Sequence, residues 1–193
     1  MAPERRRPDP RLERTRTAVT SAASDLLLAG GVRAVTIEAV VEASGVARST
    51  IYRHWPTRSE VVAAAFARLL PPTTPPPAEG KLADRLRAVM TPRVPEMNGT
   101  RYVPLVSSLL GEAARDPELA DLREQFVRTQ QAPLLAVLGD AVDAGELPAG
   151  TDLDEATSTL LGPLLFERLI LGREIDPGFA DRTIDGFLAH ARA

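Results

Sequence analysis

The sequence predicts an all-α fold, and two observations carry this prediction. Apolar residues recur along most of the chain at the i, i+3, i+4 spacing of amphipathic helices, and no segment alternates apolar and polar residues as a strand does. Seventeen prolines and thirteen glycines supply the points at which these helices end. Hydrophobic residues make up 44% of the 193 residues, so we expect about nine helices around a substantial core.

Residues 36–55 predict two short helices joined by a sharp turn. The first, residues 36–43, has an amphipathic stripe and begins at Thr36, whose hydroxyl can cap it. Gly45 provides the permissive backbone that the turn needs. The second helix, residues 47–54, has a narrow apolar stripe and otherwise carries hydrogen-bond donors and hydroxyls without any acid. Side chains of this kind bind phosphates and base edges, so the pattern predicts a nucleic-acid contact.

The segment TIEAVVEASGVARSTIYRHW and the PTRSE that follows it resemble the helix-turn-helix of the tetracycline-repressor (TetR) family of bacterial transcription regulators. The resemblance is strong over residues 11–70. At Ala47 the family often has a serine that caps the recognition helix, and at Arg58 it often has a lysine. Loss of a capping hydroxyl costs about 1 kcal/mol, whereas arginine keeps a phosphate partner with a different geometry. The DNA contacts that the residues and the resemblance imply are Thr36, Arg48, Ser49, Thr50, Tyr52, Arg53, His54 and Arg58.

The same reasoning divides the chain into four parts. Residues 1–10 are expected to be a disordered basic arm, either a solvated tail or an additional DNA contact. Residues 11–70 form a helix-turn-helix DNA-binding domain of the three-helix type, and residues 81–193 a larger helical ligand-binding and dimerisation domain. Between them, residues 71–80 contain five prolines and predict a stiff, extended linker.

The charge distribution agrees with a DNA-facing head on an acidic body. The formal net charge of the chain is −3, which alone would not suggest a nucleic-acid partner. Residues 1–60, however, hold ten arginines against seven acids, whereas residues 61–193 hold 13 basic against 19 acidic residues. Such an asymmetry is typical of proteins that bind nucleic acid through one domain.

The body sequences RDPELADL, GELP and LLGPLLFERL resemble a regulatory domain found in actinobacterial members of the family. The resemblance implies a ligand cavity among the central helices, although plain core packing remains open for each candidate. The candidate ligand-binding residues are Met90, Met97, Tyr102, Leu109, Phe126, Gln130 and Phe166. The last two long helices carry wide apolar stripes, which in the family form a four-helix bundle between two subunits. The candidate dimer-interface residues are Leu160, Leu161, Leu164, Leu165, Ile184, Phe187 and Leu188.

No catalytic constellation can be assembled from the sequence. The two histidines, His54 and His190, belong to different predicted helices, and the motifs of zinc proteases, serine hydrolases and nucleotide-binding loops are missing. The chain has no cysteine, which excludes disulfides and thiolate chemistry. The acidic run Asp152–Glu155 resembles a metal site but is better explained as a capped helix start. We therefore expect neither an enzyme nor a cofactor nor a bound metal.

These inferences combine into one expectation. No apolar run approaches 18 residues and no signal peptide is recognisable, so a cytoplasmic protein without a membrane partner is expected. It would be a homodimeric repressor that binds an inverted repeat in double-stranded DNA and is released by a small apolar or amphipathic ligand. The signal would pass through the helix at residues 57–70 into the linker. The alternative is a ligand-binding or interaction protein of the same fold that does not bind an operator.

Overall fold

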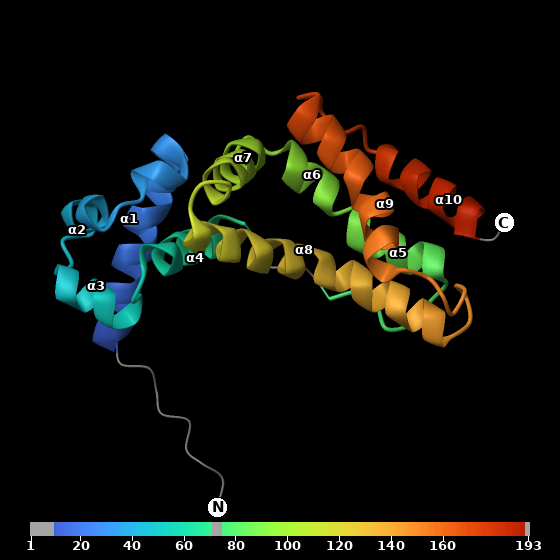
Figure 1. Ribbon diagram of the computed structural model, residues 1–193, viewed down its shortest axis with the longest axis horizontal. Helices are drawn as coiled ribbons and strands as arrows, with labels where there is room; N and C mark the ends of the chain where they lie inside the picture. The colour runs from blue at the N-terminus through green and yellow to red at the C-terminus, as the bar shows by residue number, and fades with distance from the viewer. Residues whose placement is uncertain (1–9, 71–74, 192–193) are drawn as a thin grey trace, which may run out of the picture. The chain divides into compact units, whose positions relative to one another are not determined.

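The computed structural model describes residues 10–70 and 75–191, and within these ranges it contains helices and loops but no strand. This confirms the predicted all-α fold, shown in Figure 1. Residues 1–9 of the predicted arm and residues 71–74 of the predicted linker lie outside the described residues. The elements are α1 (Pro10–Ala34), α2 (Ile37–Ser44), α3 (Arg48–His54), α4 (Arg58–Leu69), α5 (Leu82–Met90), α6 (Arg93–Asn98), α7 (Tyr102–Ala113), α8 (Pro117–Asp143), α9 (Leu153–Leu165), the π-helical segment η1 (Phe166–Ile170) and α10 (Phe179–Ala191).

These helices form two compact units. The first contains the described residues up to 70 together with residues 104–122, and the second contains residues 75–103 and 123–191. Almost all of α7 and the first turns of α8 therefore belong with α1 to α4, although they follow the linker in the sequence. The helix-turn-helix is thus part of a larger compact unit than residues 11–70 alone.

In the first unit, α1 packs against both α2 and α4. Its buried residues include Val19, Ala23 and Leu27, and α3 contributes Ile51, which is fully buried. The regular helix is interrupted at Gly30 and Gly31, which both leave helical geometry. A further turn then continues to Ala34.

The helix ends of this unit use the predicted caps. The hydroxyl of Thr36 accepts a hydrogen bond from the amide of Ala39 at 3.1 Å. Gly45 follows α2 with a φ of +68°, a left-handed conformation that glycine adopts without strain. The hydroxyl of Thr57 accepts from the amide of Glu60 at 3.3 Å at the start of α4. The sequence therefore located the start of α2 and the corner between α2 and α3.

In the second unit, α10 packs against both α5 and α9, as Figure 1 shows. The core is aliphatic, and its fully buried members include Leu86, Met90, Leu138, Leu160 and Ile184. The helix α5 ends before Pro92, and Pro92 and Pro95 then stand at the N-cap and in the first turn of α6. Proline is tolerated in the first turn of a helix, where its missing N–H has no intrahelical partner.

The end of α9 passes directly into a π-helical segment. α-Helical hydrogen bonding stops at Leu165, and η1 follows. Pro163 lies in the last turn of α9 and cannot donate an amide hydrogen bond to the preceding turn. The wider turn is closed by the amide of Leu171, which donates to the carbonyl of Phe166 at 3.0 Å.

The start of α9 provides a test of the capping argument. The carboxylate of Asp152 accepts hydrogen bonds from the amides of Asp154 at 2.9 Å and Glu155 at 3.0 Å. We predict that Asp152→Ala lowers the free energy of unfolding by about 1 kcal/mol, because two amides lose their acceptor. Asp152→Asn, which retains a capping oxygen, should stay close to the wild type. Urea denaturation followed by circular dichroism measures both, and equal midpoints for the two variants would contradict this role of Asp152.

Candidate nucleic-acid interface

The exposed side of α3 is the candidate interface. Arg48, Ser49, Tyr52 and Arg53 are exposed, whereas Thr50 and His54 are partly buried. The opposite side of the helix is anchored by Ile51, and the buried Trp55 follows directly after the helix. α3 therefore presents hydroxyls, a phenol and two guanidinium groups to solvent, and it contributes no acid of its own.

Arg48 and Tyr52 act as one group on this face. The guanidinium of Arg48 lies 5.6 Å from the centroid of the Tyr52 ring and donates a long hydrogen bond of 3.5 Å to its hydroxyl. It also forms an ion pair of 2.8 Å with Glu38 of α2. The hydrogen bond to Tyr52 and the charge of Glu38 raise the pKa of Arg48 above its ordinary value. Because all three side chains are exposed, a DNA phosphate would compete with Glu38 for Arg48.

The first turn of α3 has no side-chain cap, as the alanine at position 47 predicts. Ala47 occupies the N-cap position with an extended backbone, and no side chain accepts a hydrogen bond from the first amides of the helix. These amides carry the partial positive charge of a helix N-terminus. They lie beside Arg48 on an exposed part of the chain, which adds to the positive potential of this face.

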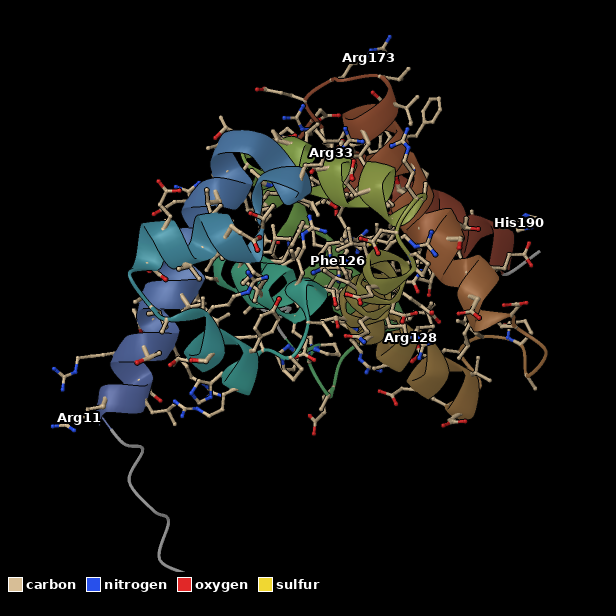
Figure 2. All side chains as sticks on the ribbon, turned by 60° about the vertical axis from the view of Figure 1, so that its left-hand side comes forward. Arg11, Arg33, Phe126, Arg128, Arg173 and His190 are labelled. Atoms are coloured by element: carbon tan, nitrogen blue, oxygen red, sulfur yellow. The ribbon has the colours of Figure 1, made fainter. Side chains whose placement is uncertain are left out.

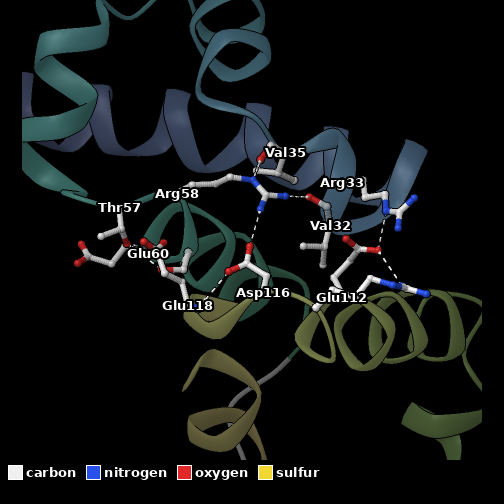
Figure 3. A network of polar contacts seen from close by, with 11 residues as sticks. Val32, Arg33, Val35, Thr57, Arg58, Glu60, Glu112, Asp116 and Glu118 are labelled. Atoms are coloured by element: carbon white, nitrogen blue, oxygen red, sulfur yellow. Dashed lines mark hydrogen bonds and ion pairs between the residues drawn. The ribbon is translucent and has the colours of Figure 1, made fainter. Parts of the chain in front are cut away.

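The two predicted contacts outside α3 are placed differently from one another. Thr36 is exposed, but its hydroxyl is used as the cap of α2. Arg58 is partly buried, and its guanidinium donates to the main-chain carbonyls of Val35 at 2.7 Å and Val32 at 2.6 Å. It also lies 3.5 Å from the carboxylate of Asp116. Figure 3 shows these contacts, which the sequence reasoning did not anticipate for Arg58.

The candidate ligand-binding residues divide between the two units. Met90 and Met97 are buried in the core of the second unit, and Tyr102 packs against that core. Leu109 is fully buried but belongs to the first unit. Phe126 and Gln130 are partly buried on α8, and Phe166 is 53% exposed at the start of η1. The structure therefore brings Met90, Met97 and Tyr102 together and does not group Leu109 with them.

A basic residue near these positions was missed by the sequence reasoning. Arg93, at the start of α6, donates to the main-chain carbonyl of Gln130 and, within the described residues, has no carboxylate at ion-pair distance. Burial lowers the pKa of Arg93. Burial also raises the pKa of the Tyr102 phenol, and the nearby positive charge of Arg93 partly opposes that change. A lone arginine between prolines carries no distinctive pattern, so the sequence gave no signal for this pair.

The candidate dimer residues are mostly internal to the chain. Leu160, Leu164 and Ile184 are fully buried in the core of the second unit. Leu161 and Leu188 retain 9% and 8% exposure, and Leu165 and Phe187 pack against the core from its edge. Large apolar side chains are instead exposed a few residues further on, at Phe166, Ile170 and Leu171. Sequence periodicity identified the apolar stripes correctly but could not show which part of them remains uncovered.

Two short helices joined by a turn that contains a glycine, the second of them with an exposed polar face, have the arrangement of the helix-turn-helix class of DNA-binding proteins. Comparison with known families gives the same result. Residues 19–65 match the model of the tetR family of bacterial regulatory proteins, and residues 76–187 match the tetracyclin repressor-like C-terminal domain. The second match alone covers more than half of the chain, so the chain belongs to the TetR family.

Individual relatives agree along most of the chain. The transcriptional regulator YdeS of Bacillus subtilis is 27% identical over 180 residues, covering 92% of this chain and 90% of the relative. The regulator Rv1556 of Mycobacterium tuberculosis is 32% identical over 149 residues, covering 77% of this chain and 73% of the relative. Both are described as transcriptional regulators of the helix-turn-helix type and not as enzymes.

Solved structures share the fold. The flavonoid-responsive regulator FrrA has a TM-score of 0.71 at 24% identity, and covers 92% of this chain and 95% of its own. A TetR-family regulator from Mesorhizobium loti has a TM-score of 0.69 at 15% identity, with coverages of 94% and 98%. Within residues 10–70 and 75–191, no helix has the length and hydrophobicity needed to cross a membrane.

The uncapped start of α3 generates a stability prediction. We expect Ala47→Ser to raise the free energy of unfolding by about 0.5–2 kcal/mol, because the serine hydroxyl can accept from the unpaired amides of the first turn. Ala43→Ser provides the control, since Ala43 is exposed within α2 and serine has a lower helix propensity there. Thermal unfolding of the two variants should therefore shift in opposite directions. No stabilisation by Ala47→Ser would mean that these amides already have other acceptors.

Proposed function

We propose that this chain is a ligand-responsive, homodimeric repressor that reads an inverted repeat in double-stranded DNA through α3. The observation that carries the proposal is the exposed, acid-free face of α3, on which Arg48, Tyr52 and Arg53 stand together. Arginine and tyrosine donate to phosphates, and arginine also donates to guanine in the major groove. We retain Thr36, Ser49, Thr50 and His54 as further contacts at the edges of this face.

A second copy of the chain is the proposed partner of the exposed apolar residues near η1. One short recognition helix reads only a few base pairs, whereas a two-fold dimer places two of them about 34–36 Å apart, one helical turn of DNA. Phe166, Ile170 and Leu171 are 53%, 69% and 41% exposed within six residues of one another. Such a cluster at the surface of a monomer marks an interface. The predicted dimer residues of α9 and α10, which lie in or against the core of the second unit, would then pack beneath the residues that form this contact.

The ligand is proposed to bind in the second unit, near Met90, Met97 and Tyr102. Family membership supports a response to a small apolar or amphipathic molecule, because members of this family commonly carry such a regulatory domain. Arg93 and the Tyr102 phenol add polar groups to an otherwise aliphatic surrounding, as ligand sites usually require. We further propose that the protein acts in the cytoplasm. The competing proposal is a ligand-binding or interaction protein of this fold that binds no operator DNA.

Footprinting on DNA that flanks its own gene decides between the two proposals, since such regulators often act on neighbouring promoters. A protected inverted repeat supports the repressor, and a duplex selected from a random-sequence pool provides the same answer if the operator lies elsewhere. Failure to protect or select any duplex at low salt would leave only the competing proposal.

The α3 face predicts two different losses of DNA affinity. Arg48→Ala should cost about 1–3 kcal/mol and alter sequence preference, because arginine at this position is expected to read a base edge. Tyr52→Phe should weaken binding evenly across sequences, as loss of a phosphate contact does. Fluorescence anisotropy with the selected duplex and with point variants of it measures both effects.

A matched control for these substitutions is Arg128→Ala on α8. Arg128 is exposed and labelled in Figure 2, and it forms an ion pair with Glu124 on its own helix. Its removal changes the net charge as Arg48→Ala does but leaves α3 intact. Equal affinities of the Arg48→Ala and Arg128→Ala variants would show that α3 does not contact the duplex.

The dimer proposal predicts that Ile170→Glu produces monomers. Ile170 is the most exposed of the large apolar residues, so the glutamate is tolerated in a monomer but would be buried without a partner in the dimer. Sedimentation velocity should show at least about a tenfold weaker association, which corresponds to about 1.4 kcal/mol. Leu28→Glu on α1 places the same charge at another exposed apolar residue and should leave the dimer intact. A dimer unaffected by Ile170→Glu would place the interface elsewhere.

A further inference from the structure

The corner between α1 and α2 is held by side chains from distant parts of the chain. A helix leaves its last carbonyl groups without intrahelical partners, and α1 ends in a single turn after Gly31. The carbonyl of Val32 accepts from the amide of Val35 at 3.2 Å, but the carbonyl of Val35 has no such partner at this corner. Both valines are buried, so water cannot readily satisfy their carbonyl groups.

Arg58 supplies the donor that the carbonyl of Val35 lacks and a second donor to the carbonyl of Val32. Its Nε donates to the carbonyl of Val35 and its Nη2 to the carbonyl of Val32, while Nη1 faces the carboxylate of Asp116. Three nitrogens of one planar group therefore hold three separate oxygens, as the close-up in Figure 3 shows. A lysine ammonium is a single point charge and cannot span these positions at once. Arginine at position 58, where the family often has a lysine, thus allows three contacts at once in this chain.

Asp116 has two functions in the loop between α7 and α8. Its Oδ1 accepts from the amide of Glu118 at 3.1 Å and so caps the start of α8. Its Oδ2 lies 3.5 Å from Nη1 of Arg58. The side chains of Asp116 and Arg58 are 37% and 30% exposed, so their attraction is only partly screened by solvent. The orientation of the α7–α8 loop is thereby linked to the start of α4.

Two further contacts from α7 reach the same corner. The hydroxyl of Ser108 accepts from the amide of Val32 at 2.7 Å, and Glu112 accepts from Nε of Arg33 at 2.6 Å. Gly31 allows this approach: its φ is +69°, and a Cβ atom there would lie 2.4 Å from the Ser108 hydroxyl oxygen. The corner is thus held by four residues from two helices and a loop, namely Arg58 of α4, Ser108 and Glu112 of α7, and Asp116 of the α7–α8 loop.

We propose that Arg58 is a positioning residue and not a phosphate contact. Together with Asp116 and the carbonyls of Val32 and Val35 it forms what we call the corner clamp, through which the α7–α8 loop sets the start of α2 and therefore the helix-turn-helix. For its effect on DNA affinity this inference rests on the proposed function. It replaces the linker with the α7–α8 loop as the route by which a change near α7 or α8 reaches α2.

Three substitutions separate the clamp from a phosphate contact. Arg58→Lys keeps the positive charge but cannot hold both carbonyls. Asp116→Asn removes the charge that faces Arg58 but keeps the cap of α8, because asparagine caps as well as aspartate. Asp121→Asn is the matched control, since Asp121 is an exposed acid on the same part of α8 and removes the same charge.

The first measurement is the affinity for the duplex that the wild-type protein selects from a random-sequence pool. The clamp predicts that Arg58→Lys and Asp116→Asn each weaken binding by about 5-fold or more, the lower end of coupling between sites. The slope of affinity against salt should not change, because no phosphate contact is lost. A phosphate contact predicts that Arg58→Lys keeps wild-type affinity, and simple electrostatics predicts that Asp116→Asn binds like Asp121→Asn or tighter. Either of these results overturns the proposal.

The second measurement uses the full chain without DNA and is independent of the proposed function. Hydrogen exchange of the amides of Val32 and of α2 should become about 10-fold faster or more in the Arg58→Lys and Asp116→Asn variants, because hydrogen bonds to a charged group are lost. Asp121→Asn should exchange as the wild type does. Unchanged exchange in both clamp variants overturns the clamp. Faster exchange in a protein that selects no duplex supports the clamp and rejects only the proposed function.

Discussion

The first compact unit depends on how the end of α1 is satisfied. The carbonyl groups of Val32 and Val35 at this end are buried. They accept hydrogen bonds from the guanidinium of Arg58, whereas at an exposed helix end they would accept them from water. Because Arg58 begins α4 and faces Asp116 before α8, one side chain joins three helix termini. The helix α3 follows α2 at the Gly45 corner and is anchored through the buried Ile51 and Trp55.

The second unit is built on a different principle. Its core is almost entirely aliphatic, although Arg85 and Thr157 are also buried. Asn98 exchanges hydrogen bonds with both main-chain groups of Ile175 at 2.8 and 2.9 Å. Arg87 likewise links α5 to Asp181 and Asp185 of α10. An aliphatic core with few directional contacts can repack with small losses. Such a core suits the proposed role of this unit in binding a small molecule.

Local patterns made most of the fold predictable. Thr36, Gly45 and Asp152 each impose a helix start or a corner through contacts within a few residues, and the structure has all three as expected. The candidate site was predictable only for α3, where one short helix contains the whole polar face. The partners of Arg58 lie 23 to 58 residues away, and no periodicity encodes such contacts. Exposure near η1 was missed because a π turn interrupts the expected repeat.

The aromatic content of the chain has a practical consequence. Trp55 is the single tryptophan, it is 9% exposed, and its ring lies 6.0 Å from that of His54 in an edge-to-face arrangement. Its intrinsic emission therefore originates directly beside the recognition helix and from nowhere in the second unit. Excitation of this natural fluorophore can follow the opening of the first unit by itself, while far-ultraviolet dichroism follows the helices of both. The protein thus contains an optical reporter beside the helix that we propose to contact DNA, without any added label.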